Sequence, residues 1–118
     1  MNEEGSKRIL LERRRQIQQE GWSTDIDDTH KGGELAWAAV CYAAPERVYT
    51  LDQGTTPRDA KISFRDPWPS KFEPSIDKRP SYKRTPSNKQ RIRALEKAGA
   101  LIAAEIDRLL RIEEEAGS

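Results

Sequence analysis

Apolar positions along the chain predict three helices, with one long polar, proline-rich segment before the last of them. In the first helix, expected over residues 6–20, Ile9, Leu10 and Ile17 form a narrow apolar stripe on an otherwise polar helix. Gly21 is suited to the left-handed conformation that ends many helices, so we expect the helix to stop there and the chain to fold back.

The second helix is expected over residues 28–44, and its apolar residues lie on every side from Leu35 onward. A helix that is apolar all round is typically buried, and Trp37 is therefore predicted to belong to the core. Gly32 and Gly33 are unfavourable inside a helix by roughly 1 kcal/mol each. They suggest that backbone or a ligand comes close at this point.

The segment 46–86 contains six prolines, which exclude a long helix and predict an irregular insert. The stretch 48–51, of sequence VYTL, is compatible with a short strand or a turn. Trp68 and Phe72 lie among the prolines, and we expect them to pin the insert to the helical core. Lining a ligand pocket is the more specific alternative for these aromatic residues.

The third helix is expected over residues 88–115, where Ser87 and Gln90 have the spacing of a capping box. Its apolar residues recur at alternating intervals of three and four, which predicts a packing seam along one face. The seam consists of Ile92, Leu95, Gly99, Ile102, Ile106 and Leu109. The chain is thus predicted to form one all-α domain over 1–118: a small bundle of three main helices with a long Pro-rich irregular insert. We expect oligomerisation, most simply a homodimer, to complete the bundle.

The net charge of +1 conceals a segregation of charge along the sequence. Residues 60–93 hold ten Lys and Arg against three Asp and Glu, whereas acidic residues outnumber basic ones on both sides. This basic segment suits a phosphate-bearing ligand, although a solvated loop has the same composition. No helix is distinctly basic on one face, so nucleic acid is an unlikely partner.

Three further features of the composition suggest a cytoplasmic protein. No apolar run approaches the length of a membrane span. The N-terminal MNEEGSKR lacks the apolar core of a signal peptide, and the lone Cys41 fits a reducing compartment.

The stretch DIDDTHKGGEL, residues 25–35, gathers four acidic residues and the only histidine of the chain. It does not fit a calcium-binding loop, because His30 and Ala36 occupy the positions that require Gly and Glu. His30 and Glu34 are four residues apart and would share one helix face, but two ligands are too few for a zinc site. A set of helix-capping and solvated acids is the alternative to a ligand site.

The segments ERRRQIQQEGW and DDTHKGGELAWAAVCYA together resemble a group of small phage-type proteins. More distantly, the chain resembles the MazG-like all-α nucleotide pyrophosphohydrolases, some of them dATP/dGTP diphosphohydrolases. The resemblance covers residues 8–44 and 90–112. The matching positions are Arg15, Gln16 and Gly21 in the first segment, Gly33 and Glu34 in the second, and the later LEKAGALIAAEI.

The enzymes of this superfamily bind Mg²⁺ through two pairs of acids spaced three residues apart, and here each pair is incomplete. Lys31 stands where the partner of Glu34 is expected, and Gly99 where the partner of Glu96 is expected. The resemblance therefore implies a nucleotide-binding architecture without catalytic residues, metal ligands or a cofactor. On this basis we expect a phage anti-defence protein that sequesters a nucleotide immune signal in the cytoplasm of an infected or lysogenic bacterial host.

Two other functions remain open. The first is a surviving Mg²⁺-dependent nucleoside triphosphate pyrophosphohydrolase, and the second is a protein–protein inhibitor of a host factor that uses the basic, aromatic insert. For a bound nucleotide, the candidate phosphate ligands are Arg15, Lys71, Lys83 and Arg84. The candidate stacking residues are Trp22 and Trp68, and the candidate contacts to the sugar or base are Asp28, His30 and Glu34.

Overall fold

The computed structural model describes residues 2–53, 62–72, 74–79 and 84–117. In chain order, the elements are α1 (Glu4–Gln19), α2 (Thr24–Asp28), α3 (Glu34–Ala43), β1 (Thr50–Gln53), β2 (Ile62–Arg65), the short 3₁₀ helix η1 (Pro74–Ile76) and α4 (Asn88–Gly117). The described chain is mostly helical, so the predicted all-α fold class is confirmed.

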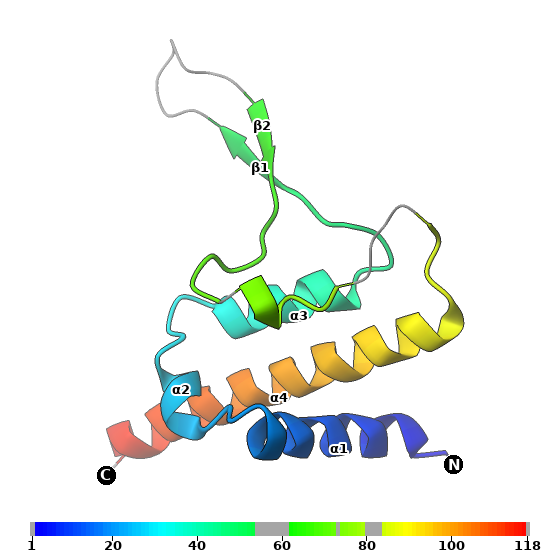
Figure 1. Cartoon of the computed structure of the whole chain (residues 1–118). Coiled ribbons are helices and arrows are strands. Elements are labelled where there is room, and N and C mark those ends of the chain that lie inside the picture. Colours follow the sequence, from blue (N-terminus) through cyan, green and yellow to red (C-terminus); the bar gives the residue numbers. More distant parts are fainter. Residues whose placement is uncertain (1, 54–61, 73, 80–83, 118) are drawn as a thin grey trace.

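Helix α4 is the central element, with α1 along one side and α3 along the other (Figure 1). Its 30 residues correspond to a length of about 45 Å at the usual rise of an α-helix. Helices α1 and α4 run in the same direction, α3 runs the opposite way, and α2 packs on the C-terminal half of α4 (Figure 1). The insert crosses over α3, and its hairpin projects away from the helices.

The core lies mainly between α3 and α4. Small side chains dominate it and allow the two helices to approach closely; they are Ala38, Ala39, Ala94, Ala98 and Ala104. Leu35 and Leu101 are the largest apolar side chains that are fully buried in it. Phe72 is also buried in this cluster and Trp68 packs against it, so the insert is pinned to the core as predicted.

Helix α1 is attached to α4 by one close apolar contact and several ion pairs. A Cβ atom on Gly99 would lie only 2.6 Å from the side chain of Ile9, so a larger residue at this position would force the Ile9 side chain to move. Arg8 forms an ion pair of 3.1 Å with Glu96, and Arg93 forms one of 2.7 Å with the buried Glu12. Much of this interface is therefore polar.

Two predicted helix ends are confirmed. Gly21 has a φ of +69°, and the N–H of Trp22 donates to the carbonyl of Gln16 at 3.1 Å, which folds the chain back after α1. At the start of α4 the capping box is complete. The Ser87 N–H donates to Gln90 at 2.9 Å, and the Gln90 N–H donates to the Ser87 hydroxyl at 3.2 Å.

The helix expected over 28–44 is instead two helices joined by a turn, α2 and α3. Gly33 has a φ of +82°, which breaks the helix immediately before Glu34. The insert is also more regular than expected, because β1 and β2 pair antiparallel with Leu51 opposite Phe64. Helix α3 is not buried on every side. Trp37 is 44% exposed, so the prediction that Trp37 belongs to the core was wrong.

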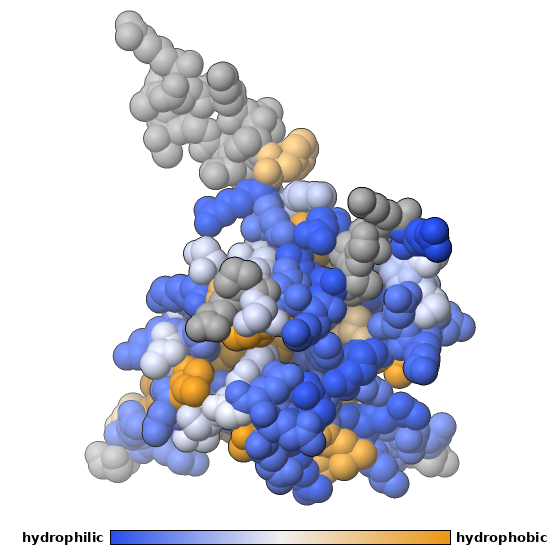
Figure 2. Space-filling view, viewed as in Figure 1, coloured by the Kyte–Doolittle hydropathy of each residue, from blue (hydrophilic) through white to orange (hydrophobic). Residues whose placement is uncertain are grey.

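Several apolar side chains remain on the surface. Figure 2 shows a face that is hydrophilic over most of its area, with separate hydrophobic patches near the helices. The seam residues of α4 other than Gly99 are each about half exposed; they are Ile92, Leu95, Ile102, Ile106 and Leu109. None of the described helices has the length and apolarity needed to cross a membrane.

Candidate functional site

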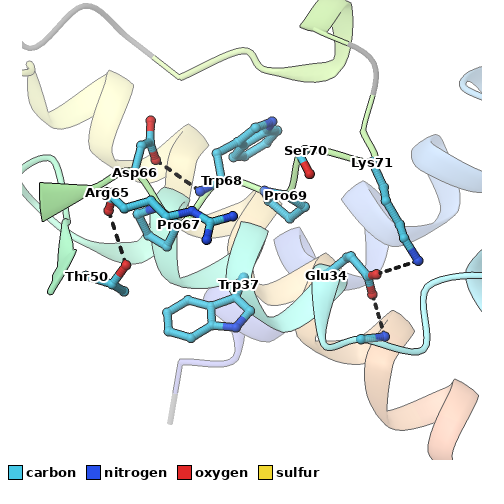
Figure 3. Close-up of a pocket in the computed structure, with 11 residues that line it drawn as sticks. Glu34, Trp37, Thr50, Arg65, Asp66, Pro67, Trp68, Pro69, Ser70 and Lys71 are labelled. Carbon is cyan, nitrogen blue, oxygen red and sulfur yellow. Dashed lines mark hydrogen bonds and ion pairs between the residues drawn. The ribbon is translucent and has the colours of Figure 1, made fainter. Parts of the chain in front are cut away.

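A cavity of about 350 Å³ lies where the start of α3 meets the segment that follows β2 (Figure 3). Helix α3 contributes Glu34 and Trp37 to its wall, and the turn before α3 contributes Gly32. The strand ends and the following loop supply the rest of the lining: Thr50, Arg65, Asp66, Pro67, Trp68, Pro69, Ser70 and Lys71. Three of the predicted ligand residues, Glu34, Trp68 and Lys71, thus line one cavity.

Glu34 is fixed by the local fold. It is the first residue of α3 and is only 8% exposed. Gly32 donates its backbone N–H to Glu34 Oε2 at 2.8 Å, and a Cβ on Gly32 would lie 2.9 Å from Oε1. The close approach predicted from the paired glycines is therefore that of a carboxylate.

The Glu34 carboxyl is held in its ionised form. Burial acts to raise its pKa, but hydrogen bonds from the backbone N–H groups of Glu34 and Gly32, with the Lys71 ammonium, lower the pKa below its ordinary value. Lys71 lies 3.4 Å from Glu34 Oε1 and its side chain is 67% exposed, so the ion pair is loose. A bound molecule with an N–H or O–H group would find a ready acceptor here.

The aromatic surface of the cavity comes mainly from Trp37. Trp68 also lines the cavity, but its ring is held by edge contacts with Tyr42 and Phe72, at centroid distances of 5.6 and 5.8 Å. The Arg79 guanidinium lies 4.7 Å from the Trp68 centroid. Trp37, by contrast, projects from α3 with nearly half of its surface exposed, and is the better stacking plane.

Arg65 and Asp66 differ in how far their charges are balanced. Asp66 accepts hydrogen bonds from Arg47 at 3.0 Å and from both terminal nitrogens of Arg79 at 3.2 and 3.0 Å. No carboxylate among the described residues pairs with the exposed Arg65. In Figure 3 its side chain extends along the cavity near Pro67. Arg65 is therefore the cation at this cavity that is available to an anionic ligand.

The two polar residues predicted to act beside Glu34 lie elsewhere. His30 packs edge-on against Phe72 at 4.8 Å and lines a separate hollow of about 40 Å³. Asp28 accepts a hydrogen bond of 2.8 Å from Arg111 of α4. The helix face that His30 and Glu34 were expected to share is absent, because the chain turns between them.

The remaining predicted ligands are also outside the cavity. Arg15 is held by Glu12 and Glu20, each at 2.8 Å, and Trp22 lines two other hollows of the surface. Arg84 is exposed on the segment before α4, and Lys83 lies outside the described residues. The structure therefore does not bring the nine candidates into one site.

Two residues of the cavity were missed in the sequence. Trp37 follows Glu34 by three residues, a spacing that places both on one side of a helix, but the apolar surroundings favoured the core. Arg65 lies in the basic insert, where no periodic pattern distinguishes it from the other cations. Within the part of the chain that is described, no three His, Cys, Asp or Glu residues are grouped so that they could hold a metal ion.

No protein-family model matches the chain, and no match is found among curated proteins or among solved structures.

Proposed function

We propose that the chain binds a nucleotide in the cavity beside α3 and releases it unchanged. The observation that supports this proposal best is the combination of three groups around one hollow. They are the exposed indole of Trp37, the Arg65 guanidinium, which no carboxylate of the described residues pairs with, and the ionised Glu34.

Each group matches one part of a nucleotide. An exposed indole stacks on a planar base, a contact worth roughly 1–3 kcal/mol. A guanidinium donates paired hydrogen bonds to phosphate oxygens, and Lys71 supplies a second positive charge. Glu34 repels phosphate but accepts hydrogen bonds from a sugar hydroxyl or a base N–H.

The size of the cavity is consistent with this ligand class. At about 350 Å³ it falls near the lower end of the usual range for small-molecule pockets, roughly 300–1,000 Å³. A single mononucleotide unit is the part of a ligand that such a volume suits. A larger nucleotide would extend beyond the cavity.

The biological role that we propose is sequestration. The chain would capture a nucleotide signal of a bacterial immune system and act in the host cytoplasm during phage infection. This part of the proposal depends on the resemblance of the segments around Glu34 and Arg15 to small phage-type proteins. Binding without turnover suits such a role, because hydrolysis is not needed to lower the concentration of free signal.

Self-association is part of the same proposal. The half-exposed residues of α4 recur with the 3–4 spacing of a helix–helix seam, and Ile102 lies near its middle. Pairing with a second copy of the chain would remove this apolar surface from water.

A second candidate function, inhibition of a host protein, is favoured by the hairpin. Leu51 and Phe64 are cross-strand neighbours that are 59% and 73% exposed, and Tyr49 beside them is 55% exposed. Exposed aromatic and aliphatic side chains on a projecting element are typical of protein-binding surfaces.

Mass spectrometry of molecules released by heat from the purified protein, followed by calorimetry with the molecule identified, tests the nucleotide proposal. We expect an intact nucleotide that rebinds to the emptied protein. If no nucleotide is released and none from a linear and cyclic panel binds, the nucleotide proposal fails and the inhibitor function replaces it.

A further inference from the structure

A second cavity, of about 400 Å³, opens between the C-terminal end of α1 and the middle of α4. Its wall contains residues from five parts of the chain: Gln16, Glu20, Trp22, Tyr42, Ser75, Ile76, Lys78, Lys97 and Leu101. It shares no lining residue with the cavity beside α3. Three observations indicate that it is built to bind.

The first observation is the balance of charge. Lys78 and Lys97 form no ion pair with any carboxylate in the described part of the chain. The only carboxylate in the wall, Glu20, is already neutralised by Arg15 at a distance of 2.8 Å. The cavity therefore presents two ammonium groups that no carboxylate of the described residues pairs with directly; Glu12 and Glu20 act on the charge of Lys97 only from a distance.

The second observation is the environment of Lys97. Its Nζ lies 5.6 Å from the centroid of the Tyr42 ring, on the edge of the core. Burial, followed by the positive charge of Arg93, lowers the pKa of Lys97 below its ordinary value; Glu12 opposes the shift and Arg15 adds to it. An anion in the cavity would relieve this crowding of like charges.

The third observation is Gln16, which is 2% exposed. Its amide nitrogen donates to Glu12 at 3.2 Å, which fixes the orientation of the side chain. Among the residues that the structure describes, the amide oxygen has no hydrogen-bond partner. A buried acceptor without a partner is destabilising, so a ligand donor that reaches it stabilises the complex.

We propose that this cavity is a second binding site, which takes a phosphate monoester of a small organic molecule. Lys78 and Lys97 hold the phosphate as compact positive charges, and the Ser75 hydroxyl lies in the same wall. The organic part lies against Trp22 and Ile76, and a donor on it reaches the Gln16 amide oxygen after a small movement of this side chain, because the oxygen is closed to solvent in the structure. The proposal is independent of the nucleotide site beside α3.

Calorimetry with phenyl phosphate, inorganic phosphate and phenol tests this assignment. We expect phenyl phosphate to bind most tightly, inorganic phosphate more weakly, and phenol not at all. Lys97→Gln and Lys78→Gln should each weaken phenyl phosphate binding at least tenfold. Lys89→Gln, which removes a charge from an exposed position of α4, serves as the matched control and should bind like the wild type.

Two comparisons make the outcome decisive. Lys78 is exposed, so we expect Lys78→Gln to remain folded. Thermal melting followed by circular dichroism verifies that Lys97→Gln is also folded. Because phenyl phosphate could also stack on Trp37 in the other cavity, both lysine variants are measured in a Trp37→Ala background as well, and each should again weaken binding at least tenfold relative to Trp37→Ala alone. Three results would overturn the proposal. The first is equal binding of phenyl phosphate by the wild type, Lys78→Gln and Lys97→Gln. The others are phenol binding as tight as that of phenyl phosphate, and no binding of phenyl phosphate at millimolar concentration.

Discussion

The Arg79 guanidinium lies 4.7 Å from the centre of the Trp68 ring and covers one face of the indole. The same guanidinium donates to Asp77 at 2.9 and 2.7 Å and to Asp66 at 3.2 and 3.0 Å. The Arg79 side chain is only 5% exposed, so these contacts are sheltered from water. Arg79 thus joins the segment after β2 to the segment after η1 and holds Trp68 against the core.

We expect Arg79→Met to destabilise the fold by about 2 kcal/mol, because it leaves the partly buried Asp77 without its ion-pair partner and Asp66 with Arg47 alone. This loss of stability is smaller than that for a fully buried ion pair, because the side chains of Asp66 and Asp77 are still 34% and 27% exposed. Urea unfolding followed by tryptophan fluorescence measures the change. Arg84→Met is the matched control and should change the free energy of unfolding by less than about 0.5 kcal/mol. Equal stability of the two variants would contradict the assigned role of Arg79.

Acid should destabilise the protein through the same residues. Burial acts to raise the pKa values of Asp66 and Asp77, but Arg79 lowers both below the ordinary value of 3.8. A lowered folded-state pKa means that the unfolded chain binds protons first, so this stabilisation is present above pH 3.8 and is lost as the pH falls below it. Asp27 acts in the opposite sense, because burial raises the pKa of its carboxyl above the ordinary value. Its contribution to the free energy of unfolding is therefore present at low pH and is lost as the pH rises.

Urea unfolding between pH 6 and pH 3 checks this expectation. The free energy of unfolding should fall toward the acid end for the wild type. In Asp77→Asn one of the two titrating acids is removed, and the loss of stability on acidification should be smaller. A pH profile of the variant parallel to that of the wild type would show that Asp77 does not carry the effect.

The seam on α4 predicts the oligomeric state. Light scattering at micromolar concentration should give about twice the 13.5 kDa mass of one chain. Leu95→Asp should yield the monomer without unfolding it, because Leu95 is 47% exposed in the single chain, and a carboxylate buried in the interface costs several kcal/mol. Phe64→Asp, on the hairpin, is the matched control and should remain a dimer. A wild-type mass near 13.5 kDa would refute the prediction.

We expect no rapid Mg²⁺-dependent hydrolysis of canonical nucleoside triphosphates. The Glu34 carboxylate is engaged by the Gly32 N–H and by Lys71, and its sequence partner three residues earlier is Lys31. Chromatography of a nucleotide panel incubated with Mg²⁺ or Mn²⁺ measures the reaction. Pyrophosphate release that disappears in Glu34→Gln would establish the pyrophosphohydrolase function instead.

The sequence was informative where one residue type determines the local backbone. Gly21 after α1 and the Ser87–Gln90 capping box specified their helix ends, because each acts through neighbouring backbone groups. The break between α2 and α3 was harder to predict, because a pair of glycines indicates a close approach but does not indicate where the next helix begins.

Which residues line the candidate site could not be predicted from the sequence, because long-range packing brings them together. In the sequence, Trp37 lies among apolar residues and Trp68 lies among prolines and charged residues. Yet α4 covers the other side of α3 and leaves Trp37 at the surface, whereas Trp68 packs against the core. Arg79 lies eleven residues after Trp68, a separation that no helical or strand period relates. The approach of the two residues comes from the path of the insert over α3, which its prolines permit but do not specify.

The two tryptophans should therefore respond differently to replacement. Trp37→Ala removes an exposed indole, so we expect it to weaken binding of the proposed nucleotide ligand at least tenfold, about 1.4 kcal/mol, with little loss of stability.

Trp68→Ala removes a ring packed against Tyr42, Phe72 and Arg79, and should lower the free energy of unfolding by about 2–3 kcal/mol. Its effect on binding should follow from that loss, and should diminish under conditions in which the variant remains folded. Calorimetry and urea unfolding of both variants, with Phe64→Ala as an exposed aromatic control, separate the two roles. Normal nucleotide binding by Trp37→Ala would show that the exposed indole is not the stacking surface.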